Sequence, residues 1–340
     1  MKNPFTGITA DPELQPGAYN AVQVCLRVQP QEKVTLITDR ESLPIAASLA
    51  AEIDTVGAPY RTWVLEDESP RPLRDMPAAI LADLETSQVS IFAAQAQTNE
   101  LHSRMQMTDV VNRRRIRHGH MVNIKRQIMM EGMRADFHKV DEISVRVRDI
   151  VSAAKQVRAR SAAGTDVTAE LNPNYRWIKT SGMISPEKWG NLPGCEVFTA
   201  PGEVNGTFVI DGVVGDYLCA RFGDLRHEPL SIRVERNRLV EASSKNAELQ
   251  QEFWRYTHTD ENSDRVGEFA IGTNIALDHV IGEILQDEKI PGVHMAFGNP
   301  YGAHTGADWD CSTHIDVVGT GFDIWADDRQ IMRQGRFTLD

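Results

Sequence analysis

The sequence lacks the features that mark several large classes of protein. Its four cysteines, Cys25, Cys195, Cys219 and Cys311, are scattered and form no CxxC pair, which indicates a reduced protein of the cytoplasm. No apolar run approaches the length of a membrane-spanning helix, so no membrane partner is expected. The polar, proline-containing first residues do not have the pattern of a signal peptide.

Positive charge and nucleotide-binding motifs are also scarce. The 36 lysines and arginines face 48 aspartates and glutamates, and the net charge of -12 argues against a nucleic-acid partner. No GxGxxG and no GxxxxGK[ST] follows a strand-like run, so we expect no nucleotide site. Internal repeats and low-complexity segments are absent from the sequence.

What is present indicates a folded chain of two domains. The 340 residues are 41% hydrophobic and 25% charged, a length and composition that suit two cores. In the first half, strand-like and helical patterns alternate, which predicts an α/β domain with a parallel sheet over residues 1–155. The strand-like runs are 34–39, 59–65, 88–95 and 120–124, and the helical ones are 41–57, 72–85, 128–133 and 140–154.

The pattern changes near residue 155. Short strand-like runs with Gly, Asn or Asp turns then predominate, which predicts a mostly β (α+β) second domain over residues 156–340. These runs are 156–171, 195–201, 206–215, 229–243, 266–274, 293–299, 312–319 and 321–332. Helices are predicted over 246–256 and around 280–285.

The strongest chemical signal is the THIDVV segment, which carries His314 and Asp316. Positions i and i+2 of a strand face the same way, so one strand could direct an imidazole and a carboxylate at the same point. The flanking Ile315, Val317 and Val318 indicate a buried strand, in which an aspartate needs a cation or several donors. An ordinary surface pair or a satisfied core pair remains the alternative.

His294 and Tyr301 are two further candidates for a metal site. His294 opens the apolar run HMAFG, and Tyr301 comes seven residues later, after a turn-prone Gly-Asn-Pro. A phenol near a metal can donate a hydrogen bond to an oxyanion. The alternative is a core histidine and a packing tyrosine.

Three acids complete the candidate set. Glu268 stands in the strand-like RVGEFAIGTN, where it needs a partner, either a metal or Arg265 in a salt bridge. Glu196 lies in an apolar run, and Glu288 lies in a polar loop where it could be merely solvated. Together these acids and histidines suffice for one or two metals and a free general base.

The order of these motifs resembles that of the thermophilic metalloaminopeptidase family. The segments that carry the resemblance are NLPGCEVFTAP, RVGEFAIGTN, DEKIPGVHMAFGNPYGAHTGAD and STHIDVV. The resemblance implies a hydrolase that uses a metal-activated water to cleave an amide or N-terminal peptide bond of a small molecule or short peptide. It also implies a homodimer and two divalent ions (zinc, cobalt or manganese).

The resemblance implies a role for each residue. The metal ligands would be Glu196, Glu268, His294, His314 and Asp316, with Glu288 as general base and Tyr301 as transition-state donor. Lys289 stands where an asparagine is more usual in that family, and the segment from Glu288 to His294 is one residue longer.

A related branch gives the alternative function. Chain length and the segment RARSAAGTDVTAEL are also similar to the 2,5-dihydroxypyridine 5,6-dioxygenases, which imply a single Fe(II) and the opening of a hydroxylated pyridine or related aromatic ring. Their metal is held by two histidines and an aspartate. His314 and Asp316 match two of these, Glu268 takes the place of the third, and His294 could supply the missing nitrogen.

Overall fold

The computed structural model describes residues 4–339, and these form two compact units. One unit comprises Met1–Phe137 with Gly182–Gly194, and the other His138–Ser181 with Cys195–Asp340. The domain boundary near residue 155 stays a sequence-based prediction. Within residues 4–339, every helix is too short or too polar to cross a lipid bilayer.

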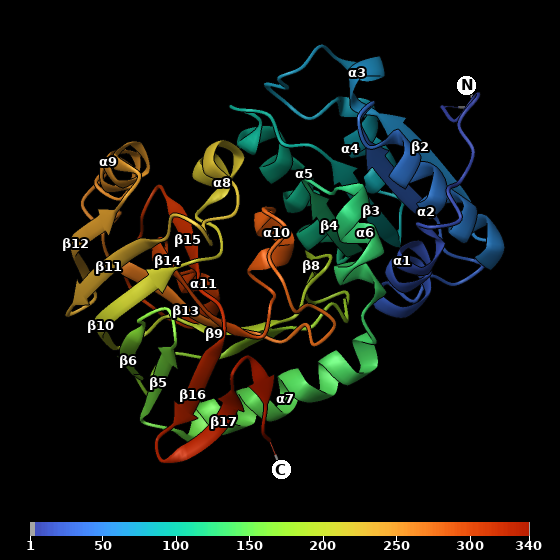
Figure 1. The fold of residues 1–340 in the computed structure, drawn as a ribbon. Coiled ribbons are helices and arrows are strands. Elements are labelled where there is room, and N and C mark those ends of the chain that lie inside the picture. Colours follow the sequence, from blue (N-terminus) through green and yellow to red (C-terminus); the bar gives the residue numbers. More distant parts are fainter. Residues whose placement is uncertain (1–3, 340) are drawn as a thin grey trace. The chain divides into compact units, whose positions relative to one another are not determined.

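The first unit is built on a parallel sheet with strand order β2-β1-β3-β4-β8 (Figure 1). Its strands are β1 (Val34–Thr38), β2 (Tyr60–Val64), β3 (Val89–Ala94), β4 (Arg117–Val122) and β8 (Gly190–Asn191). Its helices are α1 (Gln15–Tyr19), the π-helix η1 (Asn20–Cys25), α2 (Leu43–Val56), α3 (Leu65–Glu68), α4 (Ala78–Leu84), α5 (Leu101–Arg114), α6 (Arg126–Met130) and η2 (Gly132–Arg134). The predicted α/β character of this region is confirmed.

The second unit contains two antiparallel sheets. The larger has the order β12-β11-β10-β6-β5-β16-β17-β18, and the smaller has the order β15-β14-β13-β9-β7. The strands are β5 (Gln156–Ser161), β6 (Asp166–Glu170), β7 (Ile178–Thr180), β9 (Glu196–Thr199), β10 (Glu203–Ile210), β11 (Leu230–Glu235), β12 (Arg238–Ser244), β13 (Val266–Gly272), β14 (Gly292–Gly298), β15 (His314–Val318), β16 (Phe322–Ala326), β17 (Arg329–Arg333) and β18 (Arg336–Phe337). The helices are α7 (Phe137–Ala153), α8 (Asp216–Phe222), α9 (Ala247–Tyr256), α10 (Ile284–Asp287) and α11 (Gly302–Thr305). The mostly β character predicted for this half is confirmed.

Two predicted helices are shorter in the structure. The helix expected over 72–85 is confined to α4, because Pro77 occupies its N-cap position and a proline suits only the start of a helix. The helix expected around 280–285 is the single turn α10. In contrast, α2 ends as predicted, at Gly57, whose φ of 80° is favourable for glycine.

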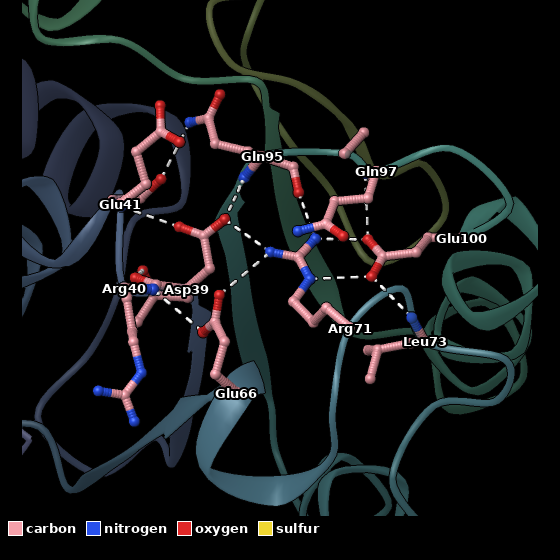
Figure 2. Close-up of polar contacts among 12 residues, drawn as sticks. Asp39, Arg40, Glu41, Glu66, Arg71, Leu73, Gln95, Gln97 and Glu100 are labelled. Atoms are coloured by element: carbon pink, nitrogen blue, oxygen red, sulfur yellow. Dashed lines mark hydrogen bonds and ion pairs between the residues drawn. The ribbon is translucent and has the colours of Figure 1, made fainter.

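A buried ion-pair network joins the loops at the carboxyl edge of the parallel sheet (Figure 2). Asp39 directly follows β1, and Gln95, which directly follows β3, donates its backbone N–H to Asp39 Oδ2 at 2.7 Å. The Arg71 guanidinium donates to Asp39 Oδ2 at 2.9 Å and to Glu100 Oε1 at 2.8 Å. The three charged side chains are at most 4% exposed, so each carboxylate depends on the single arginine for charge compensation.

The smaller sheet of the second unit has two chemically different faces. Residues directly opposite in antiparallel strands share a face, so the register sorts the side chains. One face belongs to the hydrophobic core, and its residues include Val197, Phe269, Ile271, Val293, Met295, Phe297, Ile315 and Val317. The other face carries the apolar Ile178, Phe198 and Val318 and a larger set of polar and small residues, namely Thr180, Glu196, Glu268, Ala270, Gly272, His294, Ala296, Gly298, His314 and Asp316. Two of the glycines allow close backbone approach, since a Cβ would lie 2.1 Å from the Ile290 carbonyl oxygen at Gly272 and 2.2 Å from the Thr313 carbonyl oxygen at Gly298.

A β-bulge at Gly267 places Glu268 on the polar face. The register shifts between Val266 and Glu268, so Val266 pairs with Phe297 on the core face while Glu268 pairs with Ala296 on the other. Strict alternation would have put Val266 and Glu268 on the same side. The bulge brings the backbone so close to β14 that a Cβ on Gly267 would lie 2.4 Å from the Gly298 carbonyl oxygen.

Replacing Arg71 by methionine should destabilise the first unit strongly. Asp39 and Glu100 would remain buried without a cation, which costs about 3–5 kcal/mol. Urea unfolding followed by circular dichroism measures the loss. The control is Arg40→Met, which breaks the exposed Arg40–Asp67 pair and should cost less than about 1 kcal/mol. Equal losses of unfolding free energy in Arg71→Met and Arg40→Met would contradict the claim that the buried ion pairs matter more than the exposed one.

The variant Gly267→Ala should be destabilised by about 1–3 kcal/mol, because the added methyl group forces β13 away from β14. Thermal unfolding provides the measurement. Gly190 has no atom within 4 Å of an added Cβ, so the control Gly190→Ala should change stability by no more than about 0.5 kcal/mol. Wild-type stability in Gly267→Ala would refute the close approach at the bulge.

Candidate metal centre

Six ionisable side chains converge above the polar face of the smaller sheet. Glu196 comes from β9, Glu268 from β13, His294 from β14, and His314 and Asp316 from β15. Glu288 joins them from the turn that ends α10. They form three overlapping groups, each with its ligand atoms within 4.8 Å of one another: Glu196 with Glu268 and His294, Glu268 with His314 and Asp316, and Glu288 with His294 and Asp316.

Each imidazole faces carboxylate oxygens across a short gap. His294 Nε2 lies 3.3 Å from Glu196 Oε2 and 3.4 Å from Glu268 Oε1. His314 Nε2 lies 3.5 Å from Asp316 Oδ1 and 3.9 Å from Glu268 Oε2. Glu268 therefore lies between the two histidines and can serve either group.

The donor set fits a divalent transition metal. Both ring nitrogens of His294 are buried without a hydrogen-bond partner, an arrangement that is costly unless another group satisfies one of them. His314 Nδ1 lies 3.0 Å from the Asn299 carbonyl oxygen, a contact that directs Nε2 toward the carboxylates. Imidazole nitrogen combined with carboxylate oxygen suits zinc, manganese or cobalt.

The electrostatics of the cluster show how strongly the acids act on the histidines. Burial alone would lower the pKa of His294, but Glu196 and Glu268 outweigh it and raise that pKa to about 10. Burial likewise opposes charge on His314, yet Asp316 and Glu268 raise its pKa to about 10. The site therefore attracts cations, and a bound metal would replace the protons on these imidazoles.

The pKa of the Glu288 carboxyl is raised above its usual value. Burial is the main cause that raises the pKa of this carboxyl, and the negative charges of Asp316 and Glu196 add to it, against the opposing effect of Lys289. A carboxyl with a raised pKa can exchange a proton in the neutral range, as a general base must.

Lys289 and Thr180 are part of the site, although the sequence interpretation gave neither a role. The buried Lys289 Nζ donates to Glu196 Oε2 at 2.8 Å and lies 2.5 Å from Glu288 Oε1. Thr180 Oγ1 donates to Glu196 Oε1 at 2.9 Å. No sequence pattern signals the contact between Lys289 and Glu196, because the two residues are 93 positions apart.

Tyr301 lies at the exposed side of the cluster. Its ring centroid is 4.5 Å from that of His314, and the residue is 42% exposed. Partial burial and the negative charges of Glu268 and Asp316 hold the pKa of the phenol well above its usual value. The hydroxyl therefore stays protonated and can act as a donor.

All seven residues selected from the sequence thus lie in one region of the second unit, while their roles remain predictions. The salt bridge considered between Glu268 and Arg265 is not formed. The Arg265 guanidinium instead stacks on Trp309, 3.5 Å from the ring centroid, and within residues 4–339 the charged groups at ion-pair distance from Glu268 are the two histidines.

Two solved structures are similar to this chain over almost its full length. Wild-type AmpT from Thermus thermophilus is 17% identical with a TM-score of 0.69, and the match covers 96% of this chain and 99% of AmpT. A 2,5-dihydroxypyridine dioxygenase from Pseudomonas putida is 13% identical with a TM-score of 0.69, over 96% of this chain and 97% of that one. At these identities the likeness concerns the fold. A comparison with curated proteins gave no match.

The family itself is identified by a sequence model. The model described as thermophilic metalloprotease (M29) matches residues 127–314, more than half of the chain. The resemblance noted from the sequence motifs is confirmed, and the match includes Glu196, Glu268, Glu288, His294 and His314. The chain therefore belongs to the thermophilic metalloprotease family, M29.

Proposed function

We propose that this metalloprotease-family protein is an aminopeptidase-like hydrolase, which cleaves the N-terminal amide bond of a short peptide. The observation that carries the proposal is the convergence of carboxylates and imidazoles on one face of the smaller sheet, with Glu288 and Tyr301 beside them. Glu196, Glu268, His294, His314 and Asp316 would hold one or two divalent ions such as zinc, cobalt or manganese. The chemistry supplied by such an ion is Lewis acidity, which acidifies a water and polarises the scissile carbonyl.

Glu288 is the general base of the proposed reaction. Its carboxyl lies in the group with His294 and Asp316, and its raised pKa suits proton exchange near neutrality. The base takes a proton from the attacking water and later delivers it to the leaving amine. Because both proton transfers use the Glu288 carboxyl, a glutamine in place of Glu288 would leave substrate binding intact but could transfer no proton.

Tyr301 is the donor to the developing oxyanion. Its ring packs against His314 while its residue remains partly exposed, so the hydroxyl can reach a substrate that enters from solvent. A phenol that stays protonated can donate to negative charge that develops in the transition state.

The donor groups favour hydrolysis over ring opening. Each of the three groups found within residues 4–339 contains one histidine, whereas mononuclear iron oxygenases use two histidines and one carboxylate. We also infer a homodimer from the family resemblance, and a cytoplasmic location from the scattered positions of the cysteines in the sequence.

The variant Glu288→Gln should keep its metal and lose activity by roughly 100-fold or more, because general-base catalysis is removed. Hydrolysis of aminoacyl p-nitroanilides measures the loss, and elemental analysis measures the metal. Glu203→Gln is the matched control, since Glu203 lies in β10 of the larger sheet and contacts Asn205. Unchanged hydrolysis in Glu288→Gln would refute the role of this residue.

The variant His314→Ala should lose bound metal, since the group with Glu268 and Asp316 then has no nitrogen donor. Metal content per chain, measured after anaerobic purification, gives the result. His258→Ala is the control, because His258 is exposed in the turn that follows α9 and contacts the Trp254 carbonyl. Full metal occupancy in His314→Ala would remove His314 from the ligand set, and one ferrous ion with oxygen uptake in the wild type would favour the dioxygenase alternative.

A further inference from the structure

Lys289 places a permanent positive charge inside the metal centre. The residue lies between α10 and β14, and its side chain is 1% exposed. Its backbone is fixed by hydrogen bonds at both ends, from its N–H to the Gln286 carbonyl at 2.9 Å and from the Asn274 N–H to its carbonyl at 3.0 Å. The ammonium is therefore held in position rather than extended into solvent.

The ammonium competes directly for Glu196. Lys289 Nζ donates to Glu196 Oε2, the same oxygen that faces His294 Nε2. The other oxygen, Oε1, already accepts a hydrogen bond from Thr180. Both oxygens of Glu196 are thus engaged before any metal binds, so an ion in the group with Glu268 and His294 must share a carboxylate with a lysine.

The group formed by Glu268, His314 and Asp316 has no such competitor. Within residues 4–339, no lysine or arginine lies at ion-pair distance from Glu268 or Asp316. The ion-pair partners of its two carboxylates are histidines, namely His294 and His314 for Glu268 and His314 for Asp316. The two positions that share Glu268 are therefore electrostatically unequal.

We propose that the Lys289 ammonium makes the centre asymmetric, so that it binds one divalent ion tightly at Glu268, His314 and Asp316 and a second only weakly at Glu196, Glu268 and His294. This inference rests on the proposed metal-dependent function and states how many divalent ions the site binds tightly. The physical reason is that a fixed charge in a poorly screened interior repels a divalent ion a few ångströms away.

Calorimetric titration of the metal-free protein with Mn²⁺ tests the proposal. The wild type should bind one Mn²⁺ tightly and a second at least about tenfold more weakly. Electron paramagnetic resonance at one equivalent should then show an isolated Mn²⁺ ion. Neither readout depends on catalytic activity.

The variant Lys289→Met removes the charge with a side chain of similar length. The ratio of the two Mn²⁺ dissociation constants should fall by at least about tenfold in this variant. Its electron paramagnetic resonance spectrum at two equivalents of Mn²⁺ should show two coupled ions. Lys245→Met is the matched control, because Lys245 is exposed in the same unit and should leave both steps unchanged. Circular dichroism verifies that both variants are folded.

The outcomes separate this inference from the proposed function. Two Mn²⁺ ions of equal affinity in the wild type would overturn the inference alone, and this result needs no variant. An unchanged difference between the two steps in a folded Lys289→Met would overturn it as well. Complete absence of Mn²⁺ binding by the wild type would overturn the proposed function itself.

Discussion

Repulsion among buried carboxylates is the constraint on which the second unit depends. Glu196, Glu268, Glu288 and Asp316 share one space above the smaller sheet, and Lys289 contacts only two of them. Buried charges of one sign are costly unless cations or hydrogen bonds compensate them. The rest of the sheet supports this arrangement, because its opposite face is packed into the core and fixes the strands.

The fold was predictable wherever hydrophobic periodicity was strong. The alternation of buried runs and helical spacing predicted β1, α2, β2 and β3 almost to the residue. The signal is strongest for β1 and β3, which are buried along their whole length as central parallel strands are. Helix α5 was missed, since its sequence LHSRMQMTDVVNRR is mostly polar and only four of its residues are buried. Tertiary packing of a few positions stabilises this helix, and such packing leaves a weak periodic signal.

The site was predictable to the extent that it follows strand alternation. His314 and Asp316 lie on one face of β15, as an i and i+2 pair must. Strand alternation could not place Glu268. The bulge at Gly267 puts Glu268 on the opposite face of the sheet from Val266, although the two residues are two positions apart. Lys289 was beyond the reach of pattern analysis as well, since its partner Glu196 is distant in sequence and only the folded chain brings them together.

The fold by itself does not decide the chemistry. The structure is equally similar to AmpT and to a dioxygenase, with the same TM-score, so the reaction must be set by side chains at the site. On such a scaffold, the charge on a single residue can change the number of ions that the same ligands hold. The positive charge of Lys289 is part of the protein chain, so it is present at a fixed place whether or not metal is available. A centre with one tightly bound ion and one built-in ammonium keeps Glu196 and Glu288 in position whenever the second ion is absent, so the geometry of the base does not depend on full metal loading.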